Sequence, residues 1–181
     1  MTRTYFSELC RAMEAIGEQR RAIVIGQAVK YPGTGMSKTF EKVPPEKLIE
    51  FPVMENTQLG VSIGLSLAGF HPVLSVFPRW NFLLAACDQL VNHLDKLPIY
   101  STYKPSVLIR VASGNPSPLD PGPQHIGEYS PAFKLLLKTV RIAQLFDPNK
   151  IVEEYACQFS AGGSAIIVEY PSLYDQAVRE I

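Results

Sequence analysis

One carboxylate lies between a predicted strand and a predicted helix, in the segment FPVMEN at 51–56. Glu55 is flanked there by the apolar side chains of Val53, Met54 and Leu59. A carboxylate at a helix N-terminus often does no more than interact with the helix dipole. A carboxylate that is partly buried at such a place can instead act in proton transfer. The residues around Glu55 leave both interpretations open.

Two further groups of side chains have the right chemistry for a site. Phe77, Trp80 and Phe82 lie at the junction of a predicted strand and helix, where they either anchor the core or form a stacking surface for a flat heterocycle. His125 lies in a long loop, residues 113–131, that is rich in proline and glycine. A lone loop histidine is commonly solvated, but loops of this length are uncommon unless they have a function. His125 is therefore a candidate for proton transfer.

The elements that must position these residues alternate between strands and helices. Continuous apolar runs predict strands at 22–26, 48–53, 72–77, 107–111, 140–145 and 165–168, and helical spacing predicts helices at 5–16, 56–69, 81–97 and 148–159. This alternation predicts an α/β fold, a three-layer sandwich with a mostly parallel central sheet. Ligands of such folds bind beyond the carboxyl ends of the strands, so we expect the site at the loops after Val53, Phe77 and Val111.

The predicted helix at 56–69 carries small residues at four-residue spacing, Gly60, Gly64 and Ala68. A glycine inside a helix costs about 1 kcal/mol relative to alanine, so the stripe requires a reason. Either the stripe packs closely on the domain's own sheet, or it forms a helix–helix contact between subunits. The spacing alone favours neither alternative.

Composition restricts the class of protein. The chain has 181 residues, of which 46% are hydrophobic, and this length predicts one domain with a substantial core. Lys plus Arg and Asp plus Glu each number 17, so the net charge is zero, which argues against nucleic-acid binding. No apolar run reaches the roughly 20 residues of a membrane helix, and residues 1–11 show no signal peptide.

The cysteines and histidines argue against a metal site in this chain. Cys10, Cys87 and Cys157 are widely spaced and odd in number, which indicates a reducing compartment and free thiols buried in helices. No two of the three histidines have the spacing of a metal-binding motif. We therefore expect a cytoplasmic protein with no metal ligands of its own.

Five short sequence motifs follow one another along the chain. They are Met54-Glu55 followed by GLSLAG at 64–69, Trp80-Asn81-Phe82, DQLVN at 88–92, GPQHI at 122–126 and AIIVE at 165–169. Together they resemble the pyrimidine-binding domain of thiamine-diphosphate enzymes of the transketolase superfamily. They are most similar to the beta subunit of the pyruvate dehydrogenase first component. The resemblance covers residues 4–174 and implies one transketolase-type pyrimidine-binding domain over residues 1–181.

The resemblance implies a role for each candidate residue. Glu55 would be both catalytic and cofactor-binding, because it would hydrogen-bond the aminopyrimidine ring of thiamine diphosphate. Phe77, Trp80 and Phe82 would stack on the pyrimidine, Trp80 foremost. His125 would face the substrate and handle protons or a developing oxyanion.

The sequence also departs from the family. Gln27 stands where an acidic residue is usual, and Ile126 stands where serine is usual. The chain has no GDG phrase with a downstream asparagine, the pattern that holds magnesium and diphosphate in the family, and it ends at Ile181 without the family's carboxyl-terminal domain. We therefore expect a second chain that carries the diphosphate-binding domain and Mg²⁺, in an α2β2 heterotetramer.

The expected function is that of the small subunit of a two-chain thiamine-diphosphate enzyme, active only with its partner. Such an enzyme cleaves or forms a carbon–carbon bond next to the carbonyl of a small molecule, by ketol transfer or by 2-oxo acid decarboxylation or carboligation, so transferase and lyase chemistry both remain open. One alternative is a beta-like subunit of a 2-oxo acid dehydrogenase. Another is a non-catalytic regulatory or scaffolding domain of the same fold. A generic ligand-binding α/β domain, which would bind its ligand without a partner, is a third.

Overall fold

The structure, a computed structural model, describes residues 2–32, 34–114 and 120–178. Its centre is a sheet of six strands in the order β2-β1-β3-β4-β6-β5. The strands are β1 (Ile23–Gly26), β2 (Leu48–Glu50), β3 (Val73–Phe77), β4 (Val107–Ala112), β5 (Arg141–Gln144) and β6 (Ala165–Glu169). Every neighbouring pair is parallel, so all the strands end at the same edge of the sheet. The predicted α/β fold is confirmed, and the sheet is parallel throughout.

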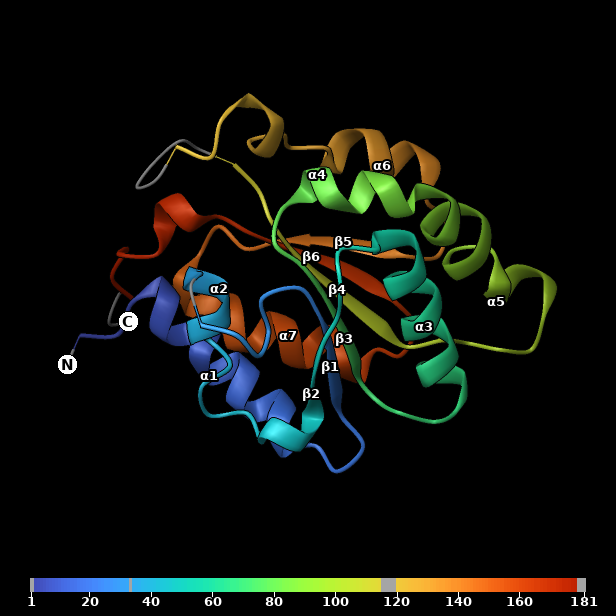
Figure 1. Ribbon diagram of the computed structural model, residues 1–181, viewed down its shortest axis with the longest axis horizontal. Helices are drawn as coiled ribbons and strands as arrows, with labels where there is room; N and C mark the ends of the chain where they lie inside the picture. The colour runs from blue at the N-terminus through green and yellow to red at the C-terminus, as the bar shows by residue number, and fades with distance from the viewer. Residues whose placement is uncertain (1, 33, 115–119, 179–181) are drawn as a thin grey trace.

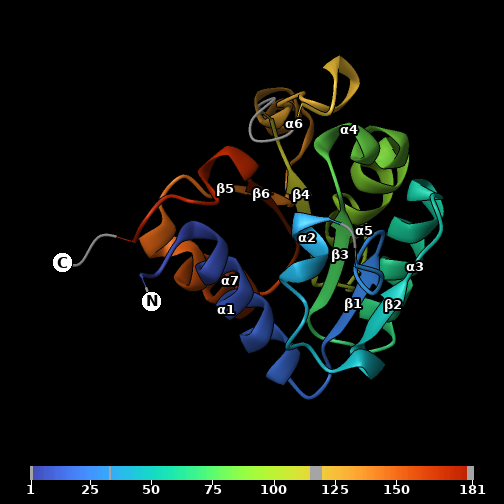
Figure 2. The same cartoon turned by 60° about the vertical axis from the view of Figure 1, so that its left-hand side comes forward.

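Helices cover both faces of this sheet (Figure 1). One face carries α1 (Tyr5–Glu18), α2 (Gly35–Lys38) and α7 (Ile151–Ser160), and the other carries α3 (Glu55–Leu67), α4 (Trp80–Leu83) and α6 (Ser130–Leu136), with α5 (Leu97–Tyr100) near one end. The turned view in Figure 2 separates these layers. Alternate strand residues enter the two cores, as Val24 and Ile25 do on β1. Because both faces are buried, the strands read as continuous apolar runs.

The segment after β3 differs from the prediction of one helix at 81–97. It consists of α4, a 3₁₀ turn (Leu84–Ala86), a π-helical segment (Gln89–Leu94) and α5. Pro98 does not end a helix but lies in the first turn of α5, where its missing N–H is not needed. The apolar spacing of a single helix is nearly preserved through these breaks, so periodicity alone could not show them. The short helices α2 and α6 were not predicted, because so few turns give no clear period.

Two expectations from composition can be compared with the structure. All three cysteines are free thiols, but Cys157 is exposed, and Cys10 and Cys87 are only partly buried. The expectation of buried thiols was therefore wrong. None of the described helices is both long enough and apolar enough to cross a membrane.

A buried ion pair joins β4 and β6 to the segment after α2 and to the C-terminal segment. Nε of Arg110 donates to Glu169 Oε2 at 2.6 Å, and both side chains are fully buried. Nη1 of Arg110 donates to Thr39 Oγ1 at 2.7 Å, and the guanidinium lies 5.2 Å from the ring centroid of Phe40. The Tyr174 hydroxyl donates to Glu169 Oε1 at 2.6 Å. Burial is the largest single influence and lowers the pKa of Arg110, but Glu169, Tyr155 and Tyr174 together raise it above its ordinary value, so the guanidinium stays charged.

Replacing Arg110 with methionine should lower the free energy of unfolding by about 3–5 kcal/mol, because Glu169 would remain buried without its partner charge. Urea denaturation followed by circular dichroism measures this loss. The control, Lys42→Met, breaks the exposed 3.0 Å pair with Glu14 and should cost less than about 1 kcal/mol. Equal losses in the two variants would contradict a structural role for the buried pair.

Candidate active site

Glu55 is the first residue of α3 and lies just beyond the carboxyl end of β2. Its side chain is partly buried, and Oε1 accepts a hydrogen bond from Nε2 of Gln27 at 3.2 Å. Gln27 directly follows β1, the strand beside β2, and is 8% exposed. Glu55 has no other side-chain hydrogen bond within the described residues. Its second oxygen, Oε2, therefore has no hydrogen-bond partner among the described residues.

A second carboxylate fixes the loop that carries Gln27. Glu50, the last residue of β2, accepts hydrogen bonds from the backbone N–H groups of residues 28–30 at 2.7, 2.9 and 2.8 Å. Ala28 has a φ of 56°, in the left-handed region, so the three successive N–H groups converge on one carboxylate. These bonds hold the exit from β1 in the conformation in which Gln27 reaches Glu55.

His125 lies in a short 3₁₀ turn (Pro123–His125) in the loop after β4 and is partly buried. Its Nδ1 is 2.9 Å from the carbonyl oxygen of Pro121. A carbonyl only accepts, so Nδ1 carries a proton, and Nε2 of the neutral ring is left as an acceptor. The ring of Phe82 meets that of His125 edge-on, with 5.3 Å between the centroids. The structure thus brings these two predicted site residues together.

Asn81 connects the histidine loop to the start of α4. Its Oδ1 accepts the N–H of Gly127 at 3.3 Å, and its Nδ2 donates to the Tyr129 hydroxyl at 3.0 Å. A side chain at position 127 would collide with the ring of Tyr129, so the loop requires glycine there. From the sequence, Asn81 was named only within the motif Trp80-Asn81-Phe82 and was given no role. Its contact was missed because it spans 46 residues.

The other two aromatic candidates lie in the core. Phe77 and Trp80 are both 0% exposed. The Trp80 ring stacks on Phe133 of α6 at 5.0 Å between centroids and meets the Tyr129 ring edge-on at 6.4 Å. This placement corresponds to the core-anchor alternative for Phe77 and Trp80. Of the three aromatics predicted to stack on a cofactor, only Phe82 retains exposed surface in this chain.

Glu55 and His125 lie on either side of the chain that leaves β3. On the first side, the N–H of Gln27 donates to the carbonyl of Val76 at 3.4 Å. On the second side, Asn81 binds the loop that carries His125. No hydrogen bond or ring contact joins Glu55 to His125 in the part of the chain that the structure describes. They form two half-sites along one edge of the sheet.

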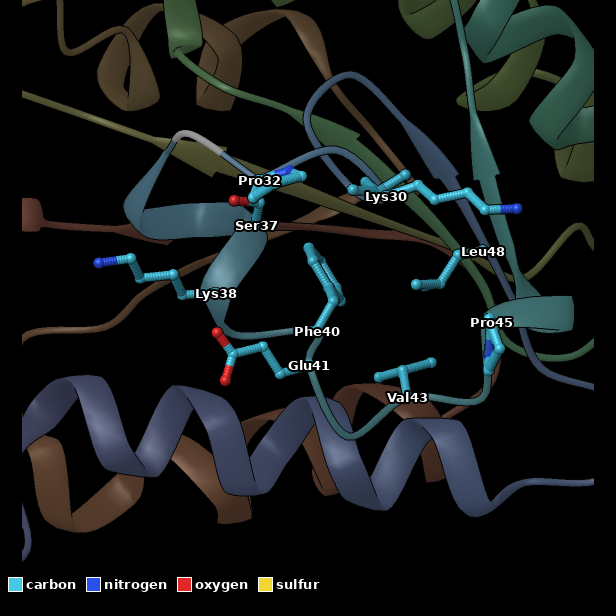
Figure 3. Close-up of a pocket in the computed structure, with 10 residues that line it drawn as sticks. Lys30, Pro32, Ser37, Lys38, Phe40, Glu41, Val43, Pro45 and Leu48 are labelled. Atoms are coloured by element: carbon cyan, nitrogen blue, oxygen red, sulfur yellow. The ribbon is translucent and has the colours of Figure 1, made fainter.

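A cavity of about 410 Å³ lies beside α2, on the sheet face that carries α1. It is lined by Val29, Lys30, Pro32, Ser37, Lys38, Phe40, Glu41, Val43, Pro45 and Leu48. Figure 3 shows Phe40 and Leu48 turned toward the hollow, whereas the ammonium group of Lys38 extends away from it. None of the predicted site residues lines this cavity, but Val29 and Lys30, whose N–H groups donate to Glu50, do.

No protein-family profile matches the chain. Comparison with individual proteins nevertheless finds relatives among two kinds of enzyme. The 1-deoxy-D-xylulose-5-phosphate synthases of Picosynechococcus sp. and Corynebacterium diphtheriae are 22% and 29% identical over 93% and 94% of this chain. The mitochondrial pyruvate dehydrogenase E1 component subunit beta-2 of Oryza sativa subsp. japonica is 26% identical over 77% of this chain and 38% of its own length. The chain spans about a quarter of the length of the two synthases, 25% and 24%.

A solved structure also has this fold. It is described as a split-gene transketolase in an inactive beta4 tetramer, and it matches 100% of this chain and 54% of its own with a TM-score of 0.73 at 17% identity. Together these comparisons confirm the resemblance to the pyrimidine-binding domain of the transketolase superfamily. The chain is related to thiamine-diphosphate enzymes.

Replacing Asn81 with alanine should loosen the histidine loop, because the Gly127 N–H loses its acceptor. One lost hydrogen bond predicts roughly fivefold to tenfold faster exchange of the Gly127 amide proton, measured by NMR. The control, Asn92→Ala, removes an exposed 2.8 Å bond to Asp88 and should leave that exchange unchanged. Equal exchange rates in wild type and Asn81→Ala would show that other contacts hold the loop.

Proposed function

We propose that this chain supplies the pyrimidine-binding half of a thiamine-diphosphate site. It serves as the small subunit of a two-chain enzyme that cleaves or forms a carbon–carbon bond next to a carbonyl. The observation that carries this proposal is the placement of Glu55, whose carboxylate has one oxygen held by Gln27 and the other open. The relationship to thiamine-diphosphate enzymes supports the same cofactor for this chain.

The residues at this edge fit the aminopyrimidine end of the cofactor. Oε2 of Glu55 is available to accept a hydrogen bond from the ring, while Gln27 fixes the direction of the carboxylate. Phe82 offers a partly exposed ring for stacking, and Phe77 and Trp80 support it from the core. When bound, thiamine diphosphate supplies the carbon nucleophile that attacks a carbonyl.

His125 is the proposed proton-handling group on the substrate side. The Pro121 carbonyl fixes its Nδ1–H, so Nε2 is the atom that takes or gives a proton. Within the described residues, no group of three or more His, Cys, Asp and Glu side chains is placed to hold a metal ion. In our proposal the second chain holds Mg²⁺ and the diphosphate.

The outer face of α3 supports an assembly of subunits. Gly64 is exposed, and a Cβ added there would meet nothing within 4 Å. Val61 and Leu67 are 39% and 44% exposed, and Glu55 is the sole charged residue of the helix. Gly60 lies against Gln89 of the same chain, but packing on the domain's own sheet does not explain the stripe at Gly64. We assign it to a subunit contact in a complex with the diphosphate-binding chain, for which we propose the stoichiometry α2β2.

A non-catalytic domain of the same fold is the second candidate function. Gln27 favours it, since it stands where the family has an acidic residue and it donates directly to Glu55. A beta-like subunit of a 2-oxo acid dehydrogenase is a variant of the first proposal, supported by the Oryza sativa relative. The next experiment separates the catalytic and non-catalytic candidates.

Glu55→Gln should lower kcat of the reconstituted two-chain enzyme by at least about 100-fold, because the amide cannot exchange a proton with the cofactor ring. The partner is sought as the product of a neighbouring reading frame that carries GDG and a downstream asparagine. The control is Glu153→Gln, at an exposed position of α7 on the opposite face of the sheet. Full turnover in Glu55→Gln would rule out the catalytic assignment.

Gly64→Leu should weaken association of the chains without harming the fold. The added side chain projects from the open face of α3 and improves helix propensity by up to about 1 kcal/mol. Sedimentation velocity should show a smaller complex, while the thermal midpoint of the isolated chain stays or rises. Ala156→Leu, at an exposed position on α7, is the matched control. Unchanged assembly in Gly64→Leu would remove α3 from the interface.

A further inference from the structure

Arg79 carries an unpaired positive charge at the candidate active site. It is the second residue after β3 and is partly buried, and its Nη1 is buried without a hydrogen-bond partner. No acid forms an ion pair with it in the described part of the chain. Most buried polar side-chain atoms have a partner, and leaving a charged donor unpaired is costly. Nη1 of Arg79 is therefore a donor without a partner among the described residues, and an anion at the guanidinium would satisfy it.

Neighbouring contacts place Arg79 between the two half-sites. Three residues before it, Val76 accepts the N–H of Gln27, the residue that holds Glu55. Two residues after it, Asn81 binds the loop that carries His125. The backbone of Arg79 is extended, and the next residue, Trp80, is fully buried in the core. The backbone of Arg79 thus lies between the two half-sites, at the edge of the sheet where the substrate would lie.

We propose that Arg79 binds a carboxylate group of the substrate. This inference rests on the proposed function, because it names the substrate class of the same site. The planar guanidinium matches a carboxylate with two parallel hydrogen bonds. One guanidinium neutralises one negative charge, which suits a carboxylate better than a phosphate monoester of about −1.5 to −2.

The bound carboxylate is one that the reaction retains. A carboxylate that leaves as carbon dioxide loses its negative charge on the way to the transition state. A guanidinium stabilises the charged ground state and would therefore slow that loss. Arg79 accordingly recognises a carboxylate remote from the bond that is cleaved or formed, as in a dicarboxylic 2-oxo acid.

The test is an NMR titration of the full chain with sodium acetate, read from the backbone amide signals of residues 80–82. We expect saturable shifts with acetate, and none with acetamide, its neutral isostere. Arg79→Gln should weaken acetate binding by about tenfold to a hundredfold. Arg20→Gln, at an exposed position ahead of β1, should leave binding unchanged.

Three results would overturn the inference: no saturable shift with acetate, equal acetate binding in Arg79→Gln, or tighter binding of inorganic phosphate than of acetate at this position. Because no cofactor is added, the outcome is independent of the proposed activity. Acetate binding at Arg79 together with full turnover in Glu55→Gln would retain the anion site and reject the cofactor assignment. Loss of turnover in Glu55→Gln without acetate binding would retain the cofactor assignment and reject the anion site.

Discussion

Each of the six strands runs parallel to its neighbours, so each delivers the chain to the same edge of the sheet. This constraint gathers the candidate residues from four successive strand exits. Gln27 follows β1, Glu55 follows β2, Arg79 follows β3 and His125 follows β4. An antiparallel arrangement would send alternate exits to opposite edges. The candidate residues can therefore lie near one another only because the strands run in the same direction.

The sequence was sufficient to predict the sheet, because strands covered on both faces must be apolar at successive positions. It also pointed to the exits of β2, β3 and β4, but not to the exit of β1, where Gln27 lies. It could not predict which aromatic faces a ligand, since the partner that buries Trp80 is Phe133, more than fifty residues away. The contact of Gln27 with Glu55 was missed for a similar reason, because it depends on the carboxylate of Glu50 holding the intervening loop.

Glu55 and the open face of α3 belong to the same helix. The proposed catalytic carboxylate therefore begins the helix whose outer face is open at Gly64 in the described part of the chain. If α3 contacts another subunit, Glu55 lies at the border of that contact, and assembly and cofactor binding depend on each other. Under the proposed function, this connection makes cofactor binding at Glu55 depend on assembly with the second chain.

The most direct test of a cofactor site shared between two chains is calorimetric. Thiamine diphosphate with MgCl₂ is titrated into this chain alone, into the chain that carries GDG and a downstream asparagine alone, and into their mixture. A shared site predicts that saturable binding at full affinity occurs only in the mixture. Equal affinity for this chain alone, or no binding in the mixture, would contradict it.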